Sequence, residues 1–283
     1  MNDTLTYINN NGESVVLSLK NGYAVETCTG ANGNTVNVAT AQGVGQVGAT
    51  VQSRVVEPVP MTITGMILGT PAEARTRANK LQEVILPGVD ARLYHNGTYY
   101  RIVTPTKTPV IEAVRRWPHF QFSVLAAYPY WLKDQTTKTI LTGVIPKFKF
   151  PWNISREYKF GETIATAFVN IRNEGQLPCP YTAAFTAKGP VENPRIVNAI
   201  TGEYMQLNRN MIAGERVTIQ ITHDLTYVTS TIDGDIRGDL DIDSDLWTMA
   251  VGDNLIKTEA DSGAANVVVS IDLAIEKVGI VIC

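Results

Sequence analysis

Apolar and polar residues alternate with a period of two through much of this chain, and this alternation constrains the fold more than any other feature. The segment 59–64 is Val-Pro-Met-Thr-Ile-Thr, and the same pattern returns at 120–126 and 217–222. Successive side chains of a strand point to opposite faces, so this period predicts strands with one buried face. The β-branched runs at 267–271 and 278–282 predict two more. We therefore expect a mainly β protein.

Two turn signals predict hairpins. Asn96-Gly97 joins Ala91–His95 to Thr98–Val103. This pair suits a type I′ turn because both central residues need positive φ. A second hairpin is expected near Thr201-Gly202, between Arg195–Ile200 and Glu203–Leu207.

One helix is predicted after Thr70. Thr70 and Glu73 form a capping box, and Pro71 suits the first helical position. The residues that follow at spacings of four, three and four form one apolar helical face: Ala74, Ala78, Leu81 and Ile85. Pro87-Gly88 ends the helix, which gives it about 16 residues. The small apolar face is expected to lie on a sheet.

A change of composition after the aromatic segment 128–131 predicts two domains. The stretch 133–143 is polar and rich in threonine. Strands and the helix precede it, and only strands are expected after it. We place an α+β domain at 1–135 and an all-β sandwich at 136–283.

Charge, cysteine usage and histidine usage argue against several functions. The net charge of −3 does not suggest the basic face of a nucleic-acid binder. Three cysteines (Cys28, Cys179, Cys283) and three widely spaced histidines give no metal-ligand spacing. No cofactor or metal is therefore expected. The N-terminal residues lack the regions of a signal peptide, and no apolar run suits a membrane span. We expect a soluble protein made in the cytoplasm, with no membrane contact.

Two motifs match ligand-binding patterns only in part. Residues 43–48 read GVGQVG, but the segment 49–68 that follows is expected to be a strand, whereas a dinucleotide site needs a helix there. The six aspartates between 233 and 245 resemble the start of a calcium loop. Leu246 stands where that loop needs glycine, and Gly252 where it needs glutamate. A flexible glycine loop and a solvated acidic edge are the favoured interpretations.

Catalytic residues are not expected. The chain has no GxSxG motif, and Ser262-Gly263 has no histidine near it in sequence. His223-Asp224 is interpreted as a strand end facing solvent, since adjacent residues of a strand point to opposite faces. Acidic pairs cannot be selected from sequence, because their separation is three-dimensional. The aromatic segments 117–120 and 128–131 are expected to pack between the domains, with a sugar-stacking platform as the alternative.

The order of these features resembles the distal tail protein family of siphophages. The strand 61–69 (MTITGMILG) is followed by the helix, the hairpin with YYRIV at 99–103, and FQFSV at 120–124 running into YPYW at 128–131. The second half adds four further segments in the family's order: NEG at 173–175, GPVENPRI at 189–196, GERVTI at 214–219 and GDN at 252–254.

This resemblance implies a structural role. It implies that the first domain builds a homohexameric ring and that the second is a galectin-like β-sandwich. The ring would join the tail tube to the baseplate or tail-tip hub proteins of the virion and let DNA pass without binding it specifically. It implies no catalytic residues, so an enzyme is not expected. Two alternatives stay open: a carbohydrate-binding adhesion module that contacts the host surface, and a cell-wall hydrolase of the tail.

Overall fold

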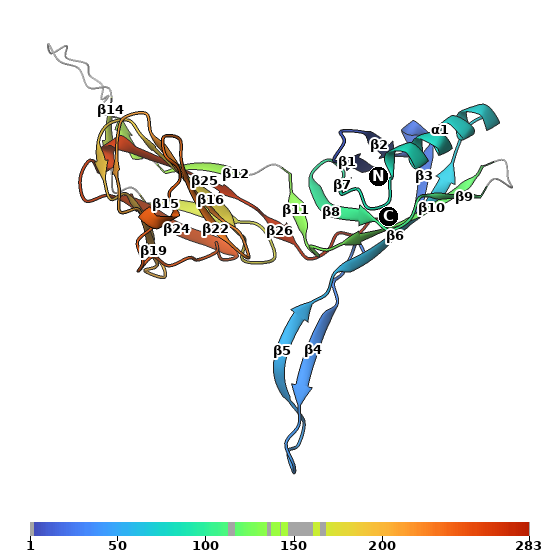
Figure 1. Ribbon diagram of the computed structural model, residues 1–283, viewed down its shortest axis with the longest axis horizontal. Helices are drawn as coiled ribbons and strands as arrows, with labels where there is room; N and C mark the ends of the chain where they lie inside the picture. The colour runs from blue at the N-terminus through green and yellow to red at the C-terminus, as the bar shows by residue number, and fades with distance from the viewer. Residues whose placement is uncertain are drawn as a thin grey trace. The chain divides into compact units, whose positions relative to one another are not determined.

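The computed structural model describes residues 3–112, 117–134, 137–141, 143–146, 161–164 and 168–282 (Figure 1). The chain divides into two compact units. Unit 1 comprises Met1–Gln135 together with Glu276–Cys283, and unit 2 comprises Thr136–Ile275. The last eight residues thus group with unit 1, which corrects the range 136–283 expected for the second domain. Strands dominate both units, so the prediction of a mainly β fold is confirmed.

Unit 1 is built on a ten-stranded antiparallel sheet. Its main path runs β2-β1-β7-β8-β10-β6-β3, with β9, β11 and β26 attached beside it. The strands are β1 (Leu5–Asn9), β2 (Ser14–Leu17), β3 (Tyr23–Thr29), β6 (Val59–Ile67), β7 (Ala91–His95), β8 (Tyr99–Pro105), β9 (Val110–Glu112), β10 (His119–Ala126), β11 (Trp131–Lys133) and β26 (Glu276–Lys277). A separate pair, β4 (Val36–Ala41) and β5 (Thr50–Val56), lies between β3 and β6 in the chain.

The predicted alternation explains how this sheet forms its core. Along β6 and β10 every second residue is buried, with Met61, Ile63, Phe120 and Phe122 at most 1% exposed. β6 and β10 pair antiparallel over eight residues, which brings Ile63 opposite Phe122. Apolar side chains of both strands therefore lie on one face, where they join a single hydrophobic cluster.

The single α-helix, α1 (Pro71–Val84), covers part of this core. Thr70 Oγ1 accepts from the Glu73 amide at 3.4 Å, and the Glu73 carboxylate accepts from the Thr70 amide at 2.8 Å. The predicted capping box is thus present. Ala74, Leu81 and Ile85 are buried as expected, the last of them as the C-cap residue. Among the described residues no helix is long and apolar enough to span a membrane.

Unit 2 is a β-sandwich. One sheet has the order β12-β25-β16-β21-β22-β23 and the other β15-β24-β18-β19. The strands are β12 (Thr137–Leu141), β15 (Val169–Asn173), β16 (Tyr181–Ala187), β18 (Arg195–Asn198), β19 (Tyr204–Gln206), β21 (Arg216–Ile221), β22 (Thr226–Ser230), β23 (Gly234–Asp235), β24 (Gly252–Glu259) and β25 (Val267–Leu273). Two small pairs complete it: β13 (Gly143–Pro146) with β14 (Gly161–Ile164), and β17 (Val191–Glu192) with β20 (Asn210–Met211). Three 3₁₀ turns are described in the chain: Leu19–Asn21, Arg237–Asp239 and Ala264–Asn266.

Both predicted hairpins are present. β7 and β8 pair across Asn96-Gly97, whose φ values of 50° and 64° fit the type I′ turn. β18 and β19 pair across the turn that contains Gly202, where φ is 82°. The sandwich encloses its own hydrophobic cluster, with Phe185, Ile219, Ile256 and Ile271 fully buried.

Candidate functional site

The most exposed regular element is the β4–β5 hairpin, which projects from the rest of unit 1 (Figure 1). We call residues 36–56 the arm. Its two strands form a two-stranded sheet of their own, with Val36 opposite Val56 and Ala41 opposite Thr50. No residue of the arm is buried. Isolated two-stranded hairpins are marginally stable in water, so a second layer is expected to cover the arm.

The arm combines apolar exposure with almost no charge. Its exposed valines are Val36, Val38, Val44, Val47, Val51 and Val55, with the two at the tip fully exposed. Arg54 is the one charged residue between positions 31 and 56. Natural proteins protect free strand edges with charges, prolines or covering elements, because an unprotected edge pairs with other chains. The arm thus has the composition of a surface that another chain covers.

The outer face of the adjoining sheet has a patch of hydroxyl side chains on β3, β6 and β10. Thr27 and Thr29 of β3 lie beside Thr64 and Thr62 of β6. The Thr27 and Thr64 hydroxyls are 2.6 Å apart, and the Thr62 hydroxyl is 3.1 Å from that of Ser123 on β10. These side chains lie opposite the buried face of the same strands. The result is a hydroxyl-rich patch in the same unit as the arm, on strands that also carry the pair of Glu26 and His119, 3.6 Å apart.

The glycine motif at 43–48 forms the tip of the arm. Gly43 O accepts from the Gln46 amide at 3.1 Å, and Gly45 and Gly48 have φ near +80°. β5 follows the motif, as expected, rather than a helix. The helix N-terminus that would hold a dinucleotide phosphate is therefore missing at this motif.

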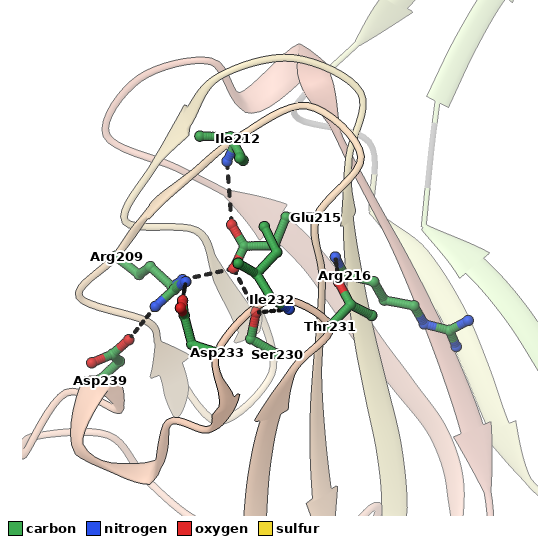
Figure 2. A network of polar contacts seen from close by, with 9 residues as sticks. All are labelled: Arg209, Ile212, Glu215, Arg216, Ser230, Thr231, Ile232, Asp233 and Asp239. Carbon is green, nitrogen blue, oxygen red and sulfur yellow. Dashed lines mark hydrogen bonds and ion pairs between the residues drawn. The ribbon is translucent and has the colours of Figure 1, made fainter.

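The acidic segment of unit 2 is engaged by an arginine (Figure 2). Arg209 Nε donates to Glu215 Oε1 at 2.8 Å, and Arg209 also contacts Asp239 at 2.8 Å and Asp233. Ser230 Oγ donates to the same Glu215 oxygen at 2.8 Å. The three carboxylates hold the pKa of Arg209 well above its usual value, chiefly through the hydrogen bonds to Asp233 and Asp239. This network stabilises the loops rather than forming an open site.

Other aspartates of the segment also accept bonds from their own unit: Asp235 from the Arg237 amide (3.1 Å), Asp241 from Asn208 Nδ2 (3.1 Å) and Asp245 from the Tyr204 amide (3.4 Å). Most of the segment is loop rather than strand. In the described ranges, no group of three or more histidine, cysteine, aspartate or glutamate residues is arranged to hold a metal.

The remaining candidate residues do not assemble into a reactive centre. His223 and Asp224 are exposed in the turn between β21 and β22. A cavity of about 580 Å³ beside α1 has a lining that includes Glu13, Lys80 and Glu83. Glu13 there accepts from Asn9 Nδ2 at 3.0 Å. The cavity lining as described contains no histidine or cysteine.

The aromatic residues divide between core and surface. Trp131 is fully buried in the core of unit 1, so it packs within that unit rather than between domains as expected. Tyr128 and Tyr130 pack edge to face with centroids 5.5 Å apart. In unit 2, Phe168 and Tyr227 are exposed, but Lys257 lies 5.7 Å from the first ring and Arg237 5.6 Å from the second. Each of these cation–π contacts covers one face of its ring.

Comparison with known proteins finds one family model and several solved structures that this chain resembles. Residues 174–272 match the model of the siphovirus-type tail component, C-terminal domain. The chain also resembles the crystal structure of the SPP1 Dit (gp 19.1) protein, described as a paradigm of the hub adsorption apparatus in phages that infect Gram-positive bacteria. The TM-score is 0.68 at 10% identity, and the match covers 95% of this chain and 98% of that chain.

Two chains of the phage P2 baseplate in its activated conformation are less similar. The calcium form gives a TM-score of 0.47 at 11% identity, covering 98% of both chains. The strontium form gives 0.45 at 10% identity, covering 96% of this chain and 97% of that chain. No curated protein matches the sequence.

Residues 174–272 are thus similar in sequence to a structural component of siphovirus-type tails, and the whole chain shares the fold of the SPP1 Dit protein. The resemblance to distal tail proteins, predicted from the order of short motifs, is confirmed. The arm was not predicted as a separate element. The sequence signal that could have revealed it is a run of 27 residues, 27–53, without a charge.

Proposed function

We propose that this protein is a structural component of a phage tail, and that copies of it assemble through unit 1 into a closed ring of six. The ring joins the tail tube to the hub or baseplate proteins at the tail tip and leaves a passage for DNA. The protein is made in the host cytoplasm, acts in the virion and carries out no catalysis. The observation that carries this proposal is the arm, whose exposed valines and free edges call for a covering chain.

Three further observations support the proposal. The same unit carries both the arm and a hydroxyl-rich patch of the sheet, and a cyclic ring needs two different surfaces of one chain that fit each other. A net charge of −3 suits a conduit, because a basic lumen would hold the phosphates of passing DNA. The family match and the shared fold with a tail hub protein agree with a place at the tail tip.

The test measures assembly directly. Native mass spectrometry and negative-stain imaging of the purified chain are expected to show six copies in an annulus. Replacing one valine on each face of the arm by lysine (Val38→Lys with Val55→Lys) is expected to give monomers, because each new ammonium would be buried at the contact.

Val110→Lys is the matched control. Val110 and Val55 are both 59% exposed in unit 1, but Val110 lies on β9, outside the arm. This variant is expected to assemble normally. A chain that stays monomeric, both alone and with a tail tube protein, would overturn the proposal. If the double lysine variant assembles with the affinity of the parent, the arm takes no part in the contact between copies.

A further inference from the structure

A tightly fixed turn, which we call the root (Gly30, Ala31 and Asn32), follows β3 and leads through residues 33–35 into the arm. There the Glu57 amide donates to the Thr35 carbonyl at 2.9 Å and so extends the pairing of β4 with β5 toward the root. Gly30 has a φ of 80°, and a Cβ at this position would lie 2.4 Å from the Pro60 carbonyl oxygen. Only glycine fits such a conformation and approach without displacing the backbone. Gly279 lies close to Asn32 as well, since a Cβ at Gly279 would meet the Asn32 backbone at 2.7 Å. The root is therefore held from two sides by backbone.

The carbonyl of Ala31 in this root receives two donors. Trp131 Nε1 donates to it at 2.9 Å, and the Ile280 amide donates at 3.0 Å. Trp131 begins β11, the last strand before the chain leaves unit 1, and Ile280 follows β26, the strand with which it returns. β11 and β26 pair with each other, Trp131 opposite Lys277. The root is thus bonded to both segments that connect unit 1 with the rest of the chain.

Arg101 of β8 adds a third contact to the root, and its burial costs desolvation free energy. The side chain is fully buried, with one terminal nitrogen donating to Gly30 O at 2.9 Å and Cζ 4.7 Å from the centre of the Trp131 ring. Nε and the other terminal nitrogen have no hydrogen-bond partner in the described structure. Burial lowers the pKa of Arg101 to about 10.

A buried arginine without a carboxylate partner is a poor way to stabilise a core. An apolar side chain of similar volume commonly serves a core as well or better. An apolar residue could not donate a hydrogen bond to the Gly30 carbonyl. Arg101 does so and also stacks on the ring of Trp131, whose Nε1 donates to the Ala31 carbonyl. The cost of this cation is consistent with a role in orienting the root rather than in core stability.

We propose that Arg101 and Trp131 are positioning residues for assembly. They fix the root, and so the direction in which the arm leaves the sheet, before a neighbouring copy binds it. A preorganised arm loses less conformational entropy on binding, which strengthens association without any new contact. The assembly part of this inference rests on the proposed function, whereas the positioning part does not.

The experiment measures arm direction and assembly separately. Spin labels at Ala49→Cys near the tip and Arg75→Cys on α1 report the distance between arm and body, in a chain that also carries Cys28→Ala and Cys283→Ser. Labelled chains are diluted with unlabelled ones, so that only distances within one chain contribute. The parent is expected to give one narrow distance distribution.

Trp131→Phe and Arg101→Met are each expected to broaden that distribution and to weaken assembly by about tenfold, the effect of losing one hydrogen bond at the root. The Ile280 amide is expected to exchange faster with solvent in both variants. Arg101→Met is expected to keep or raise the denaturant midpoint, so weaker assembly would not reflect a weaker fold. Trp131→Phe retains an aromatic ring and tests the same root if Arg101→Met fails to fold.

Trp247→Phe is the matched control, because it makes the same substitution in unit 2, where the buried Trp247 Nε1 has no hydrogen-bond partner in the described structure. It is expected to leave arm direction and assembly unchanged. A parent with a broad distribution, or variants as narrow as the parent, would overturn the inference. A narrow parent with broadened variants that assembles neither alone nor with a tail tube protein would support the positioning role and reject the proposed function.

Discussion

Glu215 is a carboxylate only 1% exposed, and three donors offset the cost of burying it. Arg209 Nε and Ser230 Oγ each donate at 2.8 Å to one carboxylate oxygen, and the Ile212 amide donates at 3.3 Å to the other (Figure 2). The Ile232 amide in turn donates to Ser230 Oγ at 3.1 Å. One side chain therefore organises the turns before β21 and after β22, which are separate in sequence.

Replacing this carboxylate by an amide tests its role at the residue scale. Glu215→Gln places an NH₂ group opposite one of the three donors and removes the negative charge of one of the three carboxylates that contact Arg209. We expect unit 2 to lose about 2–3 kcal/mol of unfolding free energy. The measurement is urea unfolding with hydrogen exchange of β21. Glu192→Gln, on the exposed side of β17 in the same unit, is expected to change stability by less than about 0.5 kcal/mol. Equal effects of both variants would contradict this account.

Elements with local signals were predictable from the sequence. The Asn96-Gly97 hairpin, the alternating strands and α1 form where short-range chemistry placed them, whereas the β-branched run 278–282, predicted as a strand, follows β26 without forming one. α1 ends at Val84, after 14 residues, with Ile85 as its cap. Long-range features were not predictable in this way. The burial of Arg101 depends on strands and segments distant in sequence, and the return of the last eight residues depends on pairing with β11. The arm was partly predictable. Valines alternate with polar residues along β4, which is a local signal for a strand, but the separation of the arm from the sheet depends on long-range contacts of the root.

The capping box of α1 gives a prediction at the element scale. Thr70→Ala removes the side-chain acceptor of the Glu73 amide, and we expect unit 1 to lose about 1 kcal/mol at pH 7. Hydrogen bonds from the Thr70 amide and, second, from the Thr70 hydroxyl lower the pKa of Glu73, and Thr70→Ala removes only the hydroxyl. A carboxylate with a lowered folded-state pKa stabilises above its unfolded value and loses that contribution as pH falls. The difference between parent and Thr70→Ala should therefore shrink below about pH 4.5.

Urea unfolding at pH 7, 5 and 4 measures that difference. Thr76→Ala is a suitable control, because Thr76 lies inside the helix and takes no part in the capping box. Its hydroxyl donates to the carbonyl of Ala72, four residues earlier in the same helix. Its effect is expected to be small and independent of pH. A Thr70→Ala effect that stays constant down to pH 4 would show that the Glu73 charge takes no part in the cap.

At the scale of the whole molecule, two hydrophobic cores share one chain. One cluster contains the buried apolar residues of unit 1, and the other contains those of unit 2. The chain leaves unit 1 after β11 and returns to it at Glu276. Ile280 and Ile282 then pack against the unit 1 core, and the Glu276 side chain accepts from the Tyr128 hydroxyl at 2.5 Å. Unit 1 is thus closed by residues that are made only after all of unit 2.

Truncation after Ile275 should consequently weaken unit 1, although the new C-terminus directly follows unit 2 in sequence. The cut removes β26 from β11, the Ile280 donor from the root, and two partly buried isoleucines from the unit 1 core. We expect unit 1 to lose about 2–4 kcal/mol of unfolding free energy. Unit 2 should keep its stability, although the new C-terminus adjoins it. Hydrogen exchange of β10 and β21 reports the two units separately. Glu215→Gln should have the opposite effect, with protection lost in β21 and kept in β10. If either variant lowers the protection of both strands equally, the two cores unfold as one.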